Sequence, residues 1–122
     1  MKILQDSMKP IYIQIAEGIE DDILNGVLAV DDHAYSQYQI AKQFNIYPAT
    51  AAKGINLLVS EGILYKKRGL GMHVSENAKE TIQNKRKTNF FSNLLKDLHE
   101  AQKLGISNEE LKNMIDITRG GD

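Results

Sequence analysis

The chain has 122 residues, enough for one compact domain or for a small domain with an appendage. Its 42% hydrophobic and 25% charged residues are ordinary for a soluble globular protein, and the lack of cysteine in the sequence excludes disulfides, cysteine-ligated zinc and thiol chemistry. No apolar run approaches the roughly 20 residues of a membrane span, and the N-terminus lacks a signal-peptide pattern. We therefore expect a cytoplasmic protein with no membrane partner.

The net charge of −1 conceals an uneven distribution along the chain. Residues 17–32 contain six acids and no lysine or arginine, whereas residues 42–73 contain five lysines or arginines and the single acid Glu61. This pattern predicts one acidic and one basic face, and local cations are sufficient to bind phosphates even when the total charge is near zero. The alternative is that these charges only coat the solvent side of each element.

The first two-thirds of the chain predict a helix-turn-helix. A helix is expected over residues 10–26, because isoleucines recur every four residues and Asn25-Gly26 is a stop signal. After a polar, acidic loop over 27–35, Ser36 can cap a short helix with Gln39 at the capping-box position. A turn at 45–47 then leads into a third helix that continues to about Glu61, and two helices joined by so short a turn fit the motif.

A β-hairpin is expected after Gly62, which suits the left-handed end of the third helix. Residues 63–65 and 72–74 are strand-like, and the tip between them, over 66–71, carries three cations and two glycines. A helix followed by a basic, glycine-tipped hairpin is the arrangement of a winged helix. Gly69-Leu70-Gly71 is a weak candidate for a phosphate-binding nucleotide loop, because it joins two strands and does not open a helix.

The last third of the chain predicts two further helices, over about 76–104 and from Ser107 onward, with Gly105 between them. The tail over 119–122 is expected to fray. The chain is thus divided into a winged helix-turn-helix DNA-binding domain at 9–76 and a two-helix dimerisation region at 77–118. The long helix has an apolar face that consists of Phe90, Phe91, Leu94, Leu95 and Leu98. This face is either an internal core stripe or a dimer seam. We favour the dimer seam, because so short a helical pair leaves the face uncovered by its own chain.

Several segments, in this order and at these distances, resemble the GntR family of bacterial transcription regulators, and in particular its short YtrA-like branch. The resemblance covers about residues 9–75 and rests on four segments: Pro10–Ala16, Ile23–Leu28, Leu57–Tyr65 and Arg68–Val74. It implies a cytoplasmic, homodimeric regulator, more specifically a repressor, bound to an inverted-repeat operator in double-stranded DNA. Larger relatives have a separate effector domain, for which this C-terminal region is too short, so a small-molecule effector would need a pocket at the dimer interface.

Two departures from the family pattern affect the expected DNA contacts. Tyr38 stands where the family commonly has a DNA-contacting arginine, and Ala49 stands where the branch has asparagine. Tyrosine hydroxyls can still meet phosphates, and an aromatic ring or an alanine can touch a thymine methyl group. The expected DNA-binding residues lie at the starts of the second and third helices and in the wing: Ser36, Gln37, Tyr38, Tyr47, Pro48, Ala49, Thr50, Lys53, Lys67, Arg68, Gly69 and Gly71, with Lys66 also at the tip.

No catalytic arrangement is found in the sequence, and the acids of the first helix are interpreted as a solvent face. His33, His73 and His99 share no helical spacing, so neither a metal site nor a cofactor is expected. The sequence-based hypothesis is therefore a DNA-binding regulator and not an enzyme. The main alternative, kept open by Tyr38 and the alanines around Lys53, is a winged-helix protein-interaction module that has lost specific DNA reading.

Overall fold

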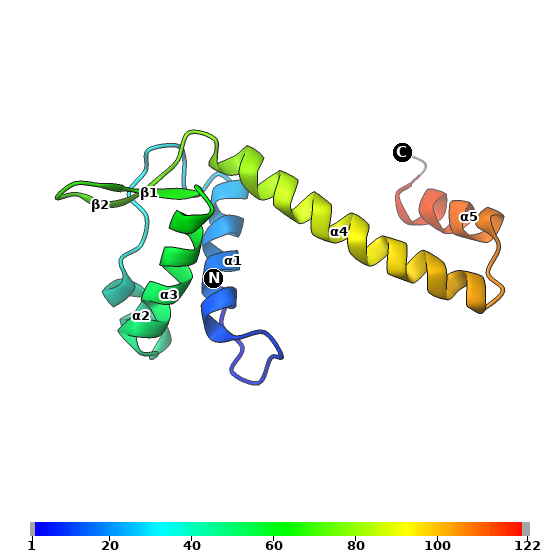
Figure 1. Cartoon of the computed structure of the whole chain (residues 1–122), viewed down its shortest axis with the longest axis horizontal. Helices are drawn as coiled ribbons and strands as arrows, with labels where there is room; N and C mark the ends of the chain where they lie inside the picture. The colour runs from blue at the N-terminus through cyan, green and yellow to red at the C-terminus, as the bar shows by residue number, and fades with distance from the viewer. Residues whose placement is uncertain (1, 121–122) are drawn as a thin grey trace. The chain divides into compact units, whose positions relative to one another are not determined.

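The computed structural model describes residues 2–120 of the chain. These residues form five helices and one two-stranded antiparallel hairpin, in the order α1 (Ile11–Leu24), α2 (Gln37–Phe44), α3 (Pro48–Ser60), β1 (Leu64–Lys67), β2 (Gly71–Val74), α4 (Ala78–Lys103) and α5 (Asn108–Thr118) (Figure 1). The predicted fold class, mainly helical with a winged helix-turn-helix, is confirmed. By its contacts the chain divides into two compact units, the first ending at Asn84 and the second beginning at Lys85, within α4.

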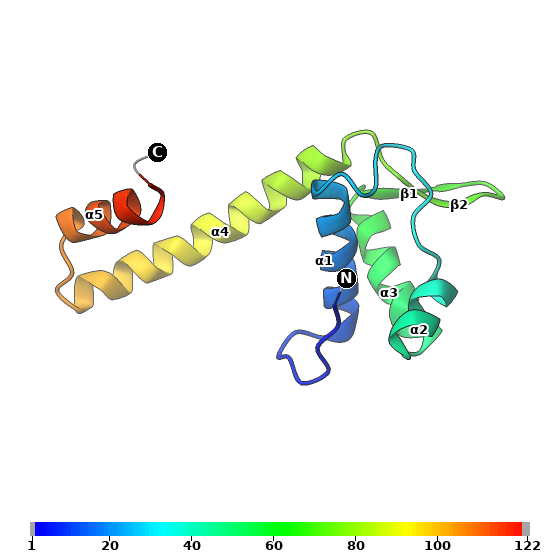
Figure 2. The ribbon, with the colours of Figure 1, turned by 180° about the vertical axis from the view of Figure 1, so that it is seen from behind.

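The first unit has a single hydrophobic core between its helices and the hairpin. Helix α3 packs against both α1 and α2, and Figures 1 and 2 show α1 and α3 side by side. The first turns of α4 also belong to this core through the fully buried Ala78 and Ile82. The largest fully buried apolar side chains in the unit come from four helices, both strands and the residue just before β1: Ile15, Ile19, Ile40, Leu58, Ile63, Leu64, Val74 and Ile82.

Helix α1 forms where the isoleucine repeat predicts it. It begins after Pro10 and ends at Leu24, and Gly26 follows with a left-handed φ of +80°. The expectation that all its acids face solvent is wrong, because Glu20 is only 1% exposed. Gly18, Ile19 and Glu20 are consecutive and all buried, so more than one side of the helix is covered, which a single apolar stripe does not predict.

The crossing of α1 and α3 depends on a glycine. A Cβ at Gly54 would lie 2.7 Å from the carbonyl oxygen of Tyr12 and 3.0 Å from Cγ2 of Ile15. The two helices therefore approach more closely than any larger residue at position 54 permits.

Gly54→Ala is expected to destabilise the protein. Overpacking costs about 1–3 kcal/mol, whereas the gain in helix propensity is at most about 1 kcal/mol. The packing term dominates because the obstructing atom belongs to the backbone and cannot rotate away. Chemical denaturation should give a free energy of unfolding lower by about 1–2 kcal/mol. An unchanged or raised midpoint would mean that the helix pair has room for a methyl group.

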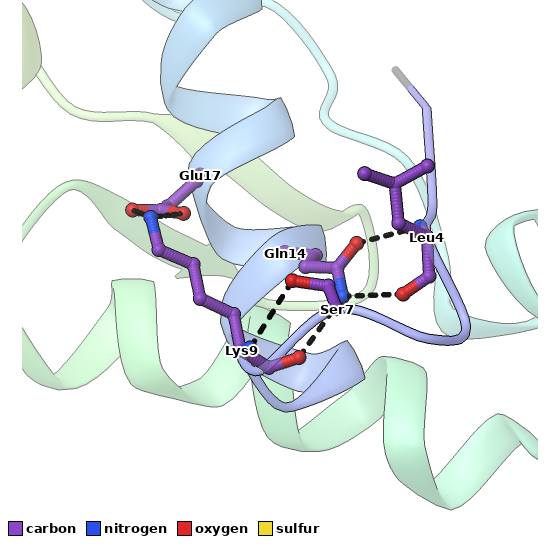
Figure 3. A network of polar contacts seen from close by, with 5 residues as sticks. All are labelled: Leu4, Ser7, Lys9, Gln14 and Glu17. Carbon is purple, nitrogen blue, oxygen red and sulfur yellow. Dashed lines mark hydrogen bonds and ion pairs between the residues drawn. The ribbon is translucent and has the colours of Figure 1, made fainter.

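The segment before α1 is fastened to it by a polar network (Figure 3). The Gln14 side chain accepts from the Leu4 amide at 2.7 Å and donates to the carbonyls of Leu4 and Lys9 at 2.9 and 3.0 Å. The Ser7 hydroxyl accepts from the Lys9 amide, and the Lys9 ammonium lies 2.8 Å from Glu17. These contacts fix the chain beside the first turn of α1, where Tyr12 lies.

The loop after α1, expected to be only a polar connection, pairs with the hairpin. The amides of Asp31 and Ala34 donate to the carbonyls of Val74 and Met72 at 2.9 and 2.8 Å, and the Val74 amide donates to Asp32 at 3.0 Å. His33 forms a β-bridge with His73, and the two imidazoles stack edge to face with centroids 5.0 Å apart. The base of the hairpin therefore has a third extended segment beside β2.

The residue that follows this paired segment, Tyr35, contacts α1. The Tyr35 hydroxyl donates to Asp22 at 2.6 Å, and this hydrogen bond raises the pKa of Tyr35 to about 12. The second half of the loop is thus held on two sides, against α1 by Tyr35 and against β2 by its backbone.

The second unit comprises the rest of α4 and all of α5. Ser107 caps α5 by accepting from the Glu110 amide at 3.1 Å. Arg119 is the C-cap of α5, and Gly121 and Asp122 of the tail predicted to fray lie outside the described residues. Between residues 2 and 120, none of the helices combines the length and the apolarity needed to cross a bilayer.

Candidate nucleic-acid interface

The start of α2 has the predicted capping box. The Ser36 hydroxyl accepts from the Gln39 amide at 3.1 Å, and the Gln39 side chain accepts from the Ser36 amide at 2.8 Å. The next amides, of Gln37 and Tyr38, have no acceptor within the helix, because the first turn of any helix lacks them. Tyr38 is 69% exposed. This helix start can therefore offer two amides and a phenol hydroxyl to an anion.

The turn between α2 and α3 has the predicted three residues. Asn45 ends α2 in a left-handed conformation, φ +53°, and α3 begins at Pro48. Tyr47 is the N-cap but its side chain makes no capping hydrogen bond, and it is 81% exposed. The start of α3 leaves the Ala49 amide without an acceptor in the helix, since Pro48 has no N–H and the Thr50 amide donates to the Tyr47 carbonyl at 3.0 Å. The exposed Tyr47 hydroxyl next to it has no hydrogen-bond partner within residues 2–120.

Helix α3 presents one exposed stripe to solvent. Ala51, Gly54, Ile55 and Leu58 are buried against the rest of the unit. The exposed positions recur at helical spacing on the other side: Ala49, Lys53, Asn56 and Ser60. Of the predicted contacts, Ala49 and Lys53 lie in this stripe, and Thr50 beside it is partly buried.

A hollow of about 180 Å³ lies along one side of the exposed stripe of α3. It is lined by Asn56 and Ala52 of α3, by Tyr38 of α2 and by Gly71 and Met72 of β2. Sequence reasoning did not select Asn56, since a single amide in a helix has no local pattern to mark it. The structure places Asn56 in the lining of the same hollow as Tyr38 and Gly71, two residues predicted to contact DNA.

The hairpin tip is shorter than predicted. Lys66, Lys67 and Gly71 were expected in the tip, but the strands include all three, with Lys66 opposite Met72 and Lys67 opposite Gly71. The tip is a three-residue turn, Arg68-Gly69-Leu70, closed by a hydrogen bond of 2.8 Å from the Leu70 amide to the Lys67 carbonyl. Arg68 is thus the cation at the turn itself.

Gly71 is required for two separate reasons. Its φ is +80°, and a Cβ there would lie 2.8 Å from Nε2 of His33. The left-handed backbone and the close imidazole both disfavour a side chain at this position.

Lys67 has an acidic neighbour that the sequence does not reveal. The Asp31 carboxylate accepts a hydrogen bond from the Tyr65 hydroxyl and lies 3.8 Å from the Lys67 ammonium. The Tyr65 hydrogen bond, with Lys67 in a smaller role, holds the pKa of Asp31 below its usual value, and the same bond raises the pKa of Tyr65. The acidic loop therefore contacts the basic wing, and the two expected faces are not separate here.

The described residues contain no group of three or more histidine, aspartate or glutamate side chains that could hold a metal ion. His33 and His73 do meet, although no helical spacing relates them, and their contact is a ring stack beside the wing.

A helix-turn-helix with an exposed recognition stripe and a cationic wing defines a winged-helix DNA-binding protein.

Comparison with known proteins identifies the family. No protein-family model matches the sequence. The chain is 31% identical over 109 residues to the HTH-type transcriptional repressor YtrA of Bacillus subtilis, covering 89% of this chain and 84% of YtrA. It is 31% identical to a solved putative GntR-family regulator from Bacteroides thetaiotaomicron, with a TM-score of 0.76, covering 90% of this chain and 98% of the other. The chain belongs to the GntR family of transcription regulators, in its YtrA-like branch.

Two further matches each cover 62% of this chain. The chain is 40% identical over 76 residues to the HTH-type transcriptional repressor NagR of Bacillus subtilis, covering 62% of this chain but only 31% of NagR. It therefore spans about a third of that relative. The DNA-binding domain of AraR, solved in complex with operator ORR3, is 31% identical with a TM-score of 0.54, covering 62% of this chain and 90% of the other. These relatives are transcription regulators and not enzymes.

Proposed function

We propose that this chain is a transcriptional repressor that binds an inverted-repeat operator as a homodimer, with residues 9–76 as the DNA-binding domain and residues 77–118 as the dimerisation region. Helix α3 enters the major groove, and the starts of α2 and α3 and the wing contact phosphates. The proposed contacts are those predicted from the sequence: Ser36, Gln37, Tyr38, Tyr47, Pro48, Ala49, Thr50, Lys53, Lys67, Arg68, Gly69 and Gly71.

The observation that carries the proposal is the exposed stripe of α3 between the uncapped start of that helix and the wing. Its cation, Lys53, has no carboxylate partner among residues 2–120. An unneutralised ammonium on a recognition helix is suited to phosphate oxygens or to the acceptors on a guanine edge. The names of the relatives, a repressor and an operator-bound domain, support the same function.

The dimer is proposed from the apolar face of α4. Its five residues, Phe90, Phe91, Leu94, Leu95 and Leu98, are between 38% and 61% exposed in the second unit. Exposed apolar groups of this number on one helix commonly mark an interaction surface. A second copy is the occupant we propose, because an isologous interface pairs the same face with itself and matches the symmetry of an inverted repeat.

Selection of bound sequences from random duplex DNA tests the proposal directly. The expected result is an enriched inverted repeat with half-sites about one helical turn apart. The salt dependence of binding separates the rival function: a DNA-binding protein weakens steeply as salt rises, whereas an interaction module without DNA reading shows no appreciable binding at low salt.

Thr50→Ala is expected to relax the selected sequence as well as to weaken binding, because Thr50 lies in the first turn of α3, where base edges are read. A lost base contact removes about 1–3 kcal/mol of discrimination. Thr118→Ala is the matched control, since it makes the same change at an exposed position in the last turn of α5, away from the α3 stripe. Identical selected sequences for Thr50→Ala and the parent would remove Thr50 from base reading.

A further inference from the structure

The ammonium of Lys53 is held by an aromatic ring of another helix. Its Nζ lies 4.1 Å from the centroid of the Tyr12 ring, with Lys53 on α3 and Tyr12 on α1. Lys9 and Lys67, by contrast, each lie beside a carboxylate. Lys53 thus keeps its full positive charge while its position is restricted, because an aromatic face attracts a cation without neutralising it.

Tyr12 is itself fixed from two directions. On one side its carbonyl is the atom that Gly54 approaches, so the backbone at Tyr12 packs directly against α3 next to Lys53. On the other side the Gln14 network binds the preceding segment to the first turn of α1 (Figure 3). The Tyr12 hydroxyl makes no hydrogen bond within the described part of the chain, so the contact that Tyr12 makes with Lys53 is through its ring.

We propose that Tyr12 is a positioning residue for DNA binding, whose ring holds the Lys53 ammonium at the edge of the exposed α3 stripe before DNA arrives. This inference rests on the proposed function. A lysine has a long, flexible stem and loses much rotamer freedom when its ammonium is fixed on a ligand. A ring that restricts the lysine side chain in the free protein reduces the side-chain entropy that is lost on DNA binding, which is the general benefit of preorganisation.

The contact itself can be measured without DNA. A ring face shifts the NMR signals of protons above it to high field, so the side-chain protons of Lys53 should be shifted in the parent and in Tyr12→Phe. The shift should be absent in Tyr12→Leu, which fills similar space without a ring. Ordinary lysine shifts in the parent would overturn the proposal at this step.

The role is tested by a double-mutant cycle on the full chain, using the selected operator. Tyr12→Leu should weaken binding about two- to fivefold, the range of an exposed cation–π contact. Lys53→Met, which removes the charge but keeps the length, should weaken binding further, and adding Tyr12→Leu to it should have no additional effect. Tyr12→Phe should restore the binding lost in Tyr12→Leu, because it restores the ring.

Four results would overturn the proposal. Tyr12→Leu could bind DNA as the parent does. It could also reduce the affinity by the same factor in the parent and in Lys53→Met, which would indicate a structural role. Lys53→Met could bind as the parent does, or Tyr12→Phe could be as weak as Tyr12→Leu, which would make the hydroxyl a direct contact. A parent that selects no DNA sequence would instead overturn the proposed function, and with it the positioning role, even if the NMR shift is present.

Discussion

Leu95→Asp is expected to yield monomers that no longer bind a two-half-site operator. Leu95 lies in the middle of the apolar face of α4 and is 55% exposed, so a carboxylate there remains solvated in the separate chain. In the proposed dimer the same carboxylate would be buried without a partner, which costs several kcal/mol. Leu98→Asp should act in the same direction. Sedimentation of parent and variants at tens of micromolar gives the oligomeric state.

The matched control is Asn89→Asp, which adds the same charge to an exposed position of α4. At about 100° per residue, position 89 lies on the opposite side of the helix from the apolar face. It should leave both the dimer and operator binding unchanged. A parent that sediments as a monomer at these concentrations and still binds the two-half-site operator tightly would refute the dimer.

Removal of the wing cations should weaken binding to every DNA sequence. For Arg68→Ala and Lys67→Ala the slope of log affinity against log salt should fall by about one for each lost phosphate contact. Arg68 is at the turn and exposed, so the fold should be unaffected. Lys112→Ala, an exposed change of the same charge in α5, is the control and should leave the slope unchanged. Unchanged affinity of the double variant at physiological salt would exclude the wing from binding.

Asp31→Asn provides the opposite change at the same wing. It removes the carboxylate next to Lys67, and asparagine tolerates the left-handed backbone at this position, φ +67°. Affinity for all sequences should therefore rise. A fall would mean that the Asp31 charge serves mainly to hold the wing in place.

The parts of the fold that depend on local signals could be predicted from the sequence. The Ser36 capping box, the turn at 45–47 and the extents of α1 and α3 follow from helical spacing, caps and stop residues, and each is present. The hairpin was predicted, but its strands are longer than expected. Lys66 and Lys67 have low strand propensity, and they are in a strand because they pair with Met72 and Gly71.

The features that sequence reasoning missed all join residues far apart in the chain. The pairing of the 31–34 segment with β2, the contact of Asp31 with Lys67, and the Tyr12 ring under Lys53 have no local pattern. Glu20 was misassigned for the same reason, because burial on a second side of α1 is decided by other elements. The sequence therefore predicts candidate residues for the proposed DNA-binding surface, whereas the partners of these residues become apparent only in three dimensions.

The third segment at the base of the hairpin limits the conformational entropy that the wing can lose on binding. An isolated two-stranded hairpin is marginally stable at best, so its whole length would have to be ordered by a ligand. Here the hydrogen bonds from Asp31, Ala34 and Val74 already fix that base in the free chain. Any ordering left to a ligand is confined to the residues beyond that base, so at about 1–2 kcal/mol per residue it costs less than ordering the full hairpin.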